Sequence, residues 1–401
     1  MVAFFGGLLA LDAVAPPAAM AVAAAAAPGA GLLSRWMACF FVPSLVALPL
    51  APPLAAADGA CLAVLIVIGY AASLLSTAAV VEGVNRLIGD DGGVTAEVAA
   101  AAGKPQPAPL AFPRRLARSL LLGACAAGTA AIAAGGSSNA SMAAARGPLS
   151  SLFMLLTTLH GFVLGTRLPK MVTRVVHPLL TCAGLTLAAA AGLAAATAVP
   201  VESVLGAYMA RPACPAHVGA GGLLLSLLGP SILSFALQMF QRRQLMWRNL
   251  AAVAVAPAAA AAMGLFGTAV AARALGLSPA LRLATVSRTI TSPLAMAIAG
   301  MVGADVSIAV AIVVVSGVIG ANFGARILDA AGIQDPVARG LAQGASAHGL
   351  GTAAMANEPE AFAFSAVSMA LTATVSTVLV SLPPVRQLLV RAALGAAGTP
   401  L

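Results

Sequence analysis

The chain consists of apolar runs that are separated by short polar stretches. The runs are about 20 residues long, which is the length that an α-helix needs to cross a bilayer. They are rich in Ala, Leu and Val, and they lack the alternation of polar and apolar positions that strands of a membrane barrel show. The pattern therefore predicts an all-α, polytopic membrane protein.

The first apolar runs are irregular. Residues 2–27 form a weak span that is interrupted at Pro16 and Pro17, and Arg35 and Trp36 then mark an interface. Residues 37–54 contain four prolines, which predicts a kinked or re-entrant element. Residues 60–81 form an uninterrupted span. The later runs cover residues 119–135, 149–166, 178–199, 220–240, 249–275, 280–302, 305–325, 337–356 and 361–382. In all, about twelve membrane segments are expected, some of them broken or re-entrant.

A polar stretch divides the chain into two modules. Residues 87–115 contain charged residues, glycines and four prolines, and we interpret them as a linker. The sequence thus predicts an N-terminal membrane module over residues 1–86 and a C-terminal membrane module over residues 116–401.

Composition and charge agree with this picture. Only 8% of the residues are charged, compared with about 25% in soluble proteins. The net charge of +9 does not indicate nucleic-acid binding, because aromatic residues make up 4% and the basic residues are dispersed between the apolar runs. If the spans alternate from Arg35 to about residue 280, twelve basic residues lie on one side and four on the other, as the positive-inside rule expects. The twelve are Arg35, Arg86, Lys104, Arg114, Arg115, Arg118, Arg167, Lys170, Arg174, Arg242, Arg243 and Arg248, and the four are Arg146, Arg211, Arg273 and Arg282.

The five cysteines show no C-x-x-C spacing, and an odd number cannot all pair. We expect neither redox chemistry, nor a metal site, nor a cofactor. The chain begins directly with apolar residues, so a transit peptide is not expected within this sequence.

Three places in the C-terminal module combine polar residues with helix breakers. They are Leu227–Ser231, Ser287–Pro293 and Arg339–Asn357, and the last contains four glycines around His348. A broken helix exposes backbone N–H groups where its second half begins, and such ends bind carboxylates. Secondary transporters use this device near the middle of the bilayer.

Arg288 is the most informative charge, because a buried arginine costs at least ~2.5 kcal/mol in a membrane. Nothing acidic lies near it in sequence. It either faces a cavity that accepts a carboxylate or lies close to the interface and extends its charged end into water. His348 is either a buried neutral side chain bonded to a carbonyl or a group that binds substrate or couples transport to protons.

The hydroxyls around Arg288 bond to their own helix or to a hydroxy acid, and Asn322 is a weaker candidate that also fits an interhelical contact. The candidate substrate-binding residues are Gly229, Ser231, Arg288, Thr289, Thr291, Ser292, Asn322, Ser346, His348, Gly349, Gly351 and Thr352. The pairs Glu358 with Glu360 and Ser346 with His348 lack the third group of a catalytic constellation, so we do not expect an enzyme.

Several motifs carry a family resemblance that extends over nearly the whole chain. They are Arg35–Trp36, Phe41–Val46, Leu48–Leu50, Leu227–Gly229, Ile232–Ala236, Gly320–Phe323, Asp335–Pro336, Ala338–Gly340, Ser346–Ala354 and Glu358–Ala361. The chain resembles the plastidal glycolate/glycerate translocator family, whose members are fusions of LrgA-like and LrgB-like membrane proteins.

The resemblance implies an integral protein of the chloroplast inner envelope that exports glycolate and imports glycerate in photorespiration. It also implies an LrgA-like scaffold in residues 1–86 and an LrgB-like transport module, with an inverted repeat, in residues 116–401. The partners expected are small carboxylates and the bilayer, with a homo-oligomer left open. Two alternatives stay open: a holin-like pore or regulator of cell-wall hydrolases, and a carrier of another monocarboxylate such as pyruvate or lactate.

Overall fold

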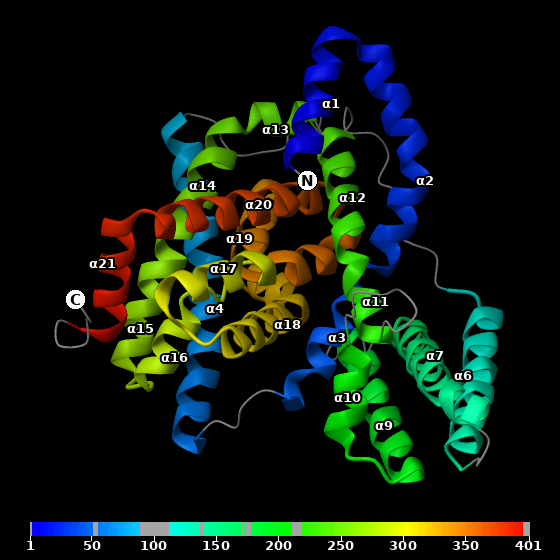
Figure 1. Cartoon of the computed structure of the whole chain (residues 1–401). Helices are drawn as coiled ribbons and strands as arrows, with labels where there is room; N and C mark the ends of the chain where they lie inside the picture. Colours follow the sequence, from blue (N-terminus) through cyan, green and yellow to red (C-terminus); the bar gives the residue numbers. More distant parts are fainter. Residues whose placement is uncertain are drawn as a thin grey trace. The chain divides into compact units, whose positions relative to one another are not determined.

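The computed structural model describes residues 2–50, 55–88, 112–136, 140–169, 172, 178–210, 219–241 and 243–395. These residues are helical almost throughout and include no strand (Figure 1). Within them, eight helices are long and apolar enough to cross a membrane. They cover Pro16–Leu33, Ala56–Ile88, Arg114–Gly135, Ala144–Gly165, Pro178–Thr197, Leu250–Ala274, Val306–Ala330 and Pro359–Ser381. With the shorter apolar helices, they confirm the predicted polytopic all-α membrane fold.

The chain forms two compact units, each built from separate stretches of sequence. Unit 1 contains Met1–Gly31, Pro52–Ala108 and Leu233–Leu401, and unit 2 contains Leu32–Ala51 and Pro109–Ile232. Most of the predicted linker, residues 89–111, lies outside the described residues. The division into modules at residues 87–115 and the inverted repeat therefore remain predictions.

The N-terminal residues differ from the expected single weak span. Helices α1 (Val2–Val14) and α2 (Pro16–Phe40) replace it, and α2 continues through Arg35 and Trp36 without a break. Pro16 opens α2, where a missing backbone N–H costs nothing. Residues 42–50 then form the short helix α3 (Val42–Val46) and a 3-10 turn (Leu48–Leu50), as the prolines predict for a kinked element.

The described residues of unit 2 include five further helices and the first turn of α12 (Leu228–Gln241). They are α6 (Arg114–Gly135), α7 (Ala140–Gly165), α9 (Pro178–Thr197), α10 (Val201–Met209) and α11 (Ala220–Ser226). An aromatic cluster joins α2 to the start of α6 and to α7: the ring of Phe112 lies 4.5 Å from that of Trp36 and 6.1 Å from that of Phe162. Arg35 stacks over Phe112 at 4.0 Å.

Helices α7 and α9 run antiparallel and pack closely. A Cβ on Gly165, at the end of α7, would lie 2.8 Å from the carbonyl oxygen of Pro178, at the start of α9. One turn earlier, a Cβ on Gly161 would lie 3.2 Å from Cα of Cys182. Small residues of this kind allow two membrane helices to approach each other. The N-terminal part of α7 therefore lies at the same end of the pair as the C-terminal part of α9.

The rest of the described chain forms unit 1. Besides α1, the part of α2 up to Gly31 and most of α12, its described elements are α4 (Ala56–Ile88), α13 (Arg243–Arg248), α14 (Leu250–Ala262), a π turn (Met263–Gly267), α15 (Thr268–Ala274), α16 (Pro279–Thr285), α17 (Ser292–Val302), α18 (Val306–Ala330), α19 (Pro336–Ala354), a 3-10 turn (Met355–Asn357), α20 (Pro359–Ser381) and α21 (Pro383–Leu394). Arg243 and Asp12 form an ion pair at 2.7 Å that ties α1 to α13.

Helix α19 is the core of unit 1. All its residues from Val337 to Thr352 are buried, and α4, α14, α18 and α20 pack around it (Figure 1). Its glycines allow this close packing: a Cβ on Gly340 would lie 2.2 Å from the carbonyl oxygen of Ala361 on α20, and one on Gly344 would lie 2.0 Å from that of Ser365. The glycines that weaken the helix locally are thus the residues that let its neighbours approach.

Candidate functional site

All three predicted helix breaks are present. Leu227 separates α11 from α12, and residues 286–291 separate α16 from α17. His348 interrupts α19 with φ 42° and ψ −140°, a left-handed φ that is uncommon for a residue with a side chain. The second and third breaks lie in unit 1.

Arg288 lies in the break between α16 and α17, with 3% of its surface exposed. Its Nε donates a hydrogen bond to Thr268 Oγ1 at 3.0 Å, and its Nη2 donates to the carbonyl oxygen of Gly69 at 2.7 Å and to Ser73 Oγ at 2.8 Å. Gly69 allows the guanidinium to approach α4 closely, since a Cβ at this position would lie 3.0 Å from Nη2. The arginine is therefore buried and held by neutral groups of α4 and α15.

One nitrogen of this guanidinium, Nη1, forms no hydrogen bond with the described residues. This nitrogen is buried, and none of the salt bridges found among the described residues involves Arg288. A buried charge without a partner costs several kcal/mol. The site is therefore incomplete by one acceptor, and an anionic oxygen is the acceptor that would stabilise it best.

The π turn between α14 and α15 contributes to this arrangement. Such turns are rare and occur often at functional sites. Here the turn precedes Thr268, which bonds Arg288, and it contains Gly264, where a Cβ would lie 2.9 Å from Thr289 Oγ1. Thr291 and Ser292 follow at the start of α17 and are half-buried, and Thr291 makes no side-chain bond to the helix end.

The break in α19 has its own set of contacts. His348 is 2% exposed, and its Nε2 lies 2.9 Å from the carbonyl oxygen of Val313 on α18. Its ring occupies the space that a Cβ on Gly317 would need, at 2.5 Å. Thr352 Oγ1 donates to the carbonyl oxygen of His348 at 2.9 Å. Ser346 Oγ is buried and has no partner among the described residues.

A buried amide connects the two halves of α19. Gln343 Nε2 donates to the carbonyl oxygen of Gly351, beyond the break, at 3.4 Å and to that of Gly320 on α18 at 3.0 Å. Gln343 Oε1 accepts a hydrogen bond from Tyr70 OH at 2.8 Å. Because Tyr70 follows Gly69, adjacent residues of α4 contact the α19 network and Arg288.

The chain has two tyrosines, which offer a matched pair of substitutions. Tyr70→Phe is expected to reduce the free energy of unfolding by about 1–3 kcal/mol, because it leaves the buried Oε1 of Gln343 without a donor. Tyr208→Phe removes a weaker bond, 3.3 Å to Thr158 Oγ1, and Thr158 keeps a bond to Met154. The melting temperatures of the two variants in detergent measure these effects. Equal melting temperatures for the two variants would contradict this role of Tyr70.

The predicted site residues fall into separate groups. Arg288, Thr289, Thr291 and Ser292 share the break before α17, whereas Ser346, His348, Gly349, Gly351 and Thr352 share α19. Gly229, which is exposed, and Ser231, whose Oγ donates to the carbonyl oxygen of Leu227 at the break before α12, belong to unit 2. Asn322 Nδ2 donates to Val318 of its own helix. No hydrogen bond joins Arg288 to His348 in the described part of the chain.

Several residues of this region were not predicted from the sequence. Gly69, Tyr70 and Ser73 lie in a helix that we interpreted as scaffold. The only local signal was a glycine and a serine four residues apart, on one face of an apolar helix. Thr268 and Gln343 were also not predicted as site residues, because their partners lie far away in the sequence.

The pairs that suggested enzyme chemistry have other contacts. Glu358 forms a two-point ion pair with Arg339, at 2.8 and 2.9 Å, and Arg339 also bonds Asp329 at 2.7 Å. These contacts join the ends of α18, α19 and α20. The part of the chain that the structure describes also contains no group of three or more His, Cys, Asp or Glu residues that could hold a metal ion.

Comparison with known proteins identifies the family of this chain. The model of the LrgB-like family matches residues 158–384, which is more than half of the chain. Plastidal glycolate/glycerate translocator 1, chloroplastic, of Arabidopsis thaliana is 35% identical over 96% of this chain and 73% of its own length. The uncharacterized protein YwbG of Bacillus subtilis is 28% identical over 37% of this chain and 63% of its own length.

A holin-like protein, CidB of Staphylococcus epidermidis, is 35% identical over 23% of this chain and 41% of its own length. No solved structure matches the chain. The family model covers more than half of the chain and the plant relative covers nearly all of it, and each match is sufficient to identify the family. This chain belongs to the LrgB-like family.

Proposed function

We propose that this protein is a secondary transporter of small 2-hydroxy monocarboxylates, exchanging glycolate for glycerate across the chloroplast inner envelope. The plant relative bears the name of such a translocator and matches nearly the whole chain. Both substrates carry one carboxylate, which ionises near pH ~3.5 and is therefore charged at neutral pH.

The observation that carries this proposal is the unpartnered Nη1 of Arg288. In a chain with 8% charged residues, a buried arginine that bonds only neutral groups retains a free N–H pair for a ligand. A carboxylate oxygen accepts charge-assisted hydrogen bonds from such a group. Thr289, Thr291 and Ser292, which follow Arg288 in sequence, offer hydroxyls for the substrate's own hydroxyl groups.

The mechanism follows from these contacts. In our proposal the carboxylate binds at Arg288 beside the start of α17, and a rigid-body movement within the membrane exposes the site to one side at a time. Ser346, His348, Gly349, Gly351 and Thr352 of α19 form a second wall of the proposed site, and Asn322 contributes a further polar group. Gly229 and Ser231 belong to the other unit and stay separate predictions. His348 is the candidate for proton coupling.

The similarity to holin-like CidB keeps a pore as the second candidate. A carrier and a pore differ in which solutes cross the membrane and in how the rate of passage depends on solute concentration. A carrier shows saturation and counter-transport, whereas a pore passes unrelated small solutes in proportion to their gradient. A carrier of pyruvate or lactate would differ from our proposal in substrate alone.

The purified chain in proteoliposomes tests these functions. Vesicles loaded with unlabelled glycerate are expected to accumulate radiolabelled glycolate, with saturation, several-fold faster than empty vesicles. Release of trapped sucrose should equal that of protein-free vesicles. Sucrose leakage without counter-transport would replace the carrier with a pore, and stimulation by internal pyruvate but not glycerate would change the substrate.

A further inference from the structure

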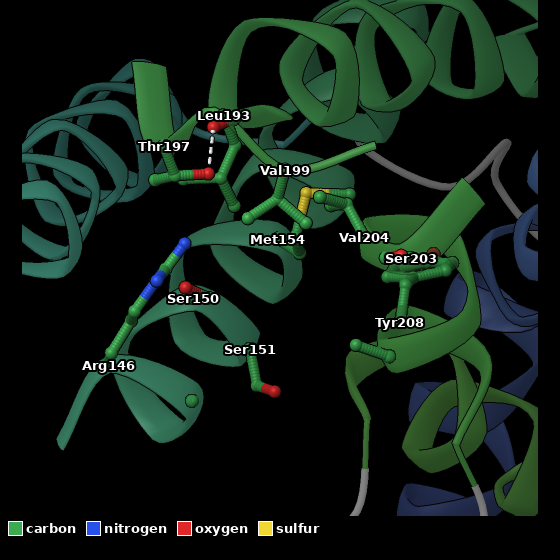
Figure 2. Close-up of a pocket in the computed structure, with 12 residues that line it drawn as sticks. Arg146, Ser150, Ser151, Met154, Leu193, Thr197, Val199, Ser203, Val204 and Tyr208 are labelled. Carbon is green, nitrogen blue, oxygen red and sulfur yellow. Dashed lines mark hydrogen bonds between the residues drawn. The ribbon is translucent and has the colours of Figure 1, made fainter. Parts of the chain in front are cut away.

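Unit 2 contains a cavity that is separate from the Arg288 site and that the proposed transport does not use. It has a volume of about 280 Å³ and lies between α7, the C-terminal part of α9 and α10 (Figure 2). Pockets for small ligands begin at about this size. The cavity is therefore large enough for a few heavy atoms or for the head of a longer molecule.

One wall of the cavity is polar and positively charged. Arg146 and Ser150 lie one turn apart on α7, Ser151 follows, and Ser203 comes from α10. Figure 2 shows the Arg146 side chain extending past Ser150 toward Thr197. A glycine makes room for the arginine, since a Cβ on Gly135 would lie 3.4 Å from Arg146 Nε.

These polar groups have no other partners. Within the described chain, Arg146 pairs with no carboxylate, and the hydroxyls of Ser150, Ser151 and Ser203 form no hydrogen bonds. None of the residues that line the cavity is acidic, and Glu202, the acidic neighbour of Ser203 in sequence, does not line it. The cavity therefore offers a cation and several donors, and it provides no internal anion.

The opposite wall is apolar. Met154, Leu193 and Tyr208 are at most 5% exposed and form its base, and Val199 and Val204 complete it. A ligand that matches both walls has one oxyanion and a short apolar part. A multiply charged ligand would leave charge against the apolar wall without a partner.

The position of the cavity in the membrane supports a functional role for the arginine. Arg146 begins the span Ala144–Gly165 and Thr197 ends the span Pro178–Thr197, so in an antiparallel pair both lie at the same membrane surface. The sequence assigns Arg146 to the side with four basic residues rather than twelve. The positive-inside rule does not require a positive charge there, so binding is the better explanation for it.

We propose that this cavity is a second anion site, which binds a monoanionic oxyanion group with a short apolar chain. A dissolved carboxylate and the phosphodiester of an anionic lipid share this chemistry. Both would place the anion between Arg146 and the serine hydroxyls and the apolar part against Met154 and Leu193. The proposal does not depend on the transport of glycolate or glycerate.

Two measurements on the full-length protein test the site. In detergent, equilibrium dialysis with radiolabelled butyrate is expected to show saturable binding that Arg146→Gln weakens about tenfold or more. In nanodiscs of phosphatidylglycerol and phosphatidylcholine, native mass spectrometry after extraction is expected to show retained phosphatidylglycerol that the same variant loses. Arg115→Gln is the control, because it removes an exposed arginine of the same unit from α6.

The outcomes distinguish a dissolved carboxylate from a lipid headgroup as the bound anion. Butyrate binding that depends on Arg146 identifies a dissolved carboxylate, and lipid retention that depends on Arg146 without butyrate binding identifies a headgroup. Absence of both, or equal binding by the Arg146 and Arg115 variants, overturns the proposal. If Arg146→Gln does not fold, the double variant Ser150→Ala/Ser203→Ala decides by the same criteria, with a severalfold loss expected.

Discussion

Arg288→Gln is expected to lower glycolate/glycerate exchange about 100-fold or more, since removing one partner of a buried ionic contact costs about 2–5 kcal/mol. Glutamine can keep a hydrogen bond to the helix that holds Arg288, but it carries no charge for the carboxylate. The measurement is the initial rate of counter-transport in proteoliposomes with equal amounts of protein. Full exchange by this variant would exclude Arg288 from the site.

The same substitution should not weaken the fold. The arginine is buried with one nitrogen unpartnered, so neutralising it relieves a cost of at least ~2.5 kcal/mol. This gain offsets the loss of hydrogen bonds to Thr268, Gly69 and Ser73. The apparent melting temperature of Arg288→Gln is therefore expected to stay close to that of the parent protein. Arg391→Gln, at an exposed position of α21, is the control and should change neither property. Loss of exchange together with a clearly lower melting temperature would indicate a structural arginine instead.

Gly344→Ala is expected to have the largest effect on stability. A Cβ at this position would lie 2.0 Å from the carbonyl oxygen of Ser365 and 2.8 Å from its Cα. These atoms belong to the backbone of α20, so a side-chain rotation cannot relieve the clash. Separating α19 from α20 is expected to cost about 1–3 kcal/mol or more.

A second glycine provides the matched control. Gly300 lies in α17 at an exposed position, and a Cβ there would meet nothing within 4 Å. Gly300→Ala should therefore raise stability by up to about 1 kcal/mol, as alanine does in a free helix position. Thermal unfolding in detergent compares the two variants. Equal melting temperatures would show that α19 and α20 are less closely packed than described.

Local signals in the sequence were sufficient for the helices and their breaks. Gly229 with Pro230, Pro293, and the glycines around His348 each marked a break that the structure contains. These residues act through their own backbone preferences, which a sequence displays directly. Pro16 likewise marked the interruption of residues 2–27, because α1 ends at Val14 and the proline begins the first turn of α2.

The surroundings of Arg288 could not be predicted in this way. Its partner Gly69 lies 219 residues earlier and its partner Ser73 lies 215 residues earlier. Neither residue is unusual within an apolar helix, so nothing local identifies the contact. The sequence showed that Arg288 has no acidic neighbour, but it left open whether the arginine lies in a cavity or near the interface, and it did not indicate that α4 would supply the neutral acceptors.

This distance along the chain bears on the order in which unit 1 folds. Contacts that join early and late parts of a chain form slowly, because the intervening loop must close first. Until Arg288 and Gln343 pack against α4, Tyr70 and Ser73 are polar groups without their final partners. The packing of α4 against the later helices is therefore expected to be a late step in the folding of unit 1, although α4 comes early in the sequence.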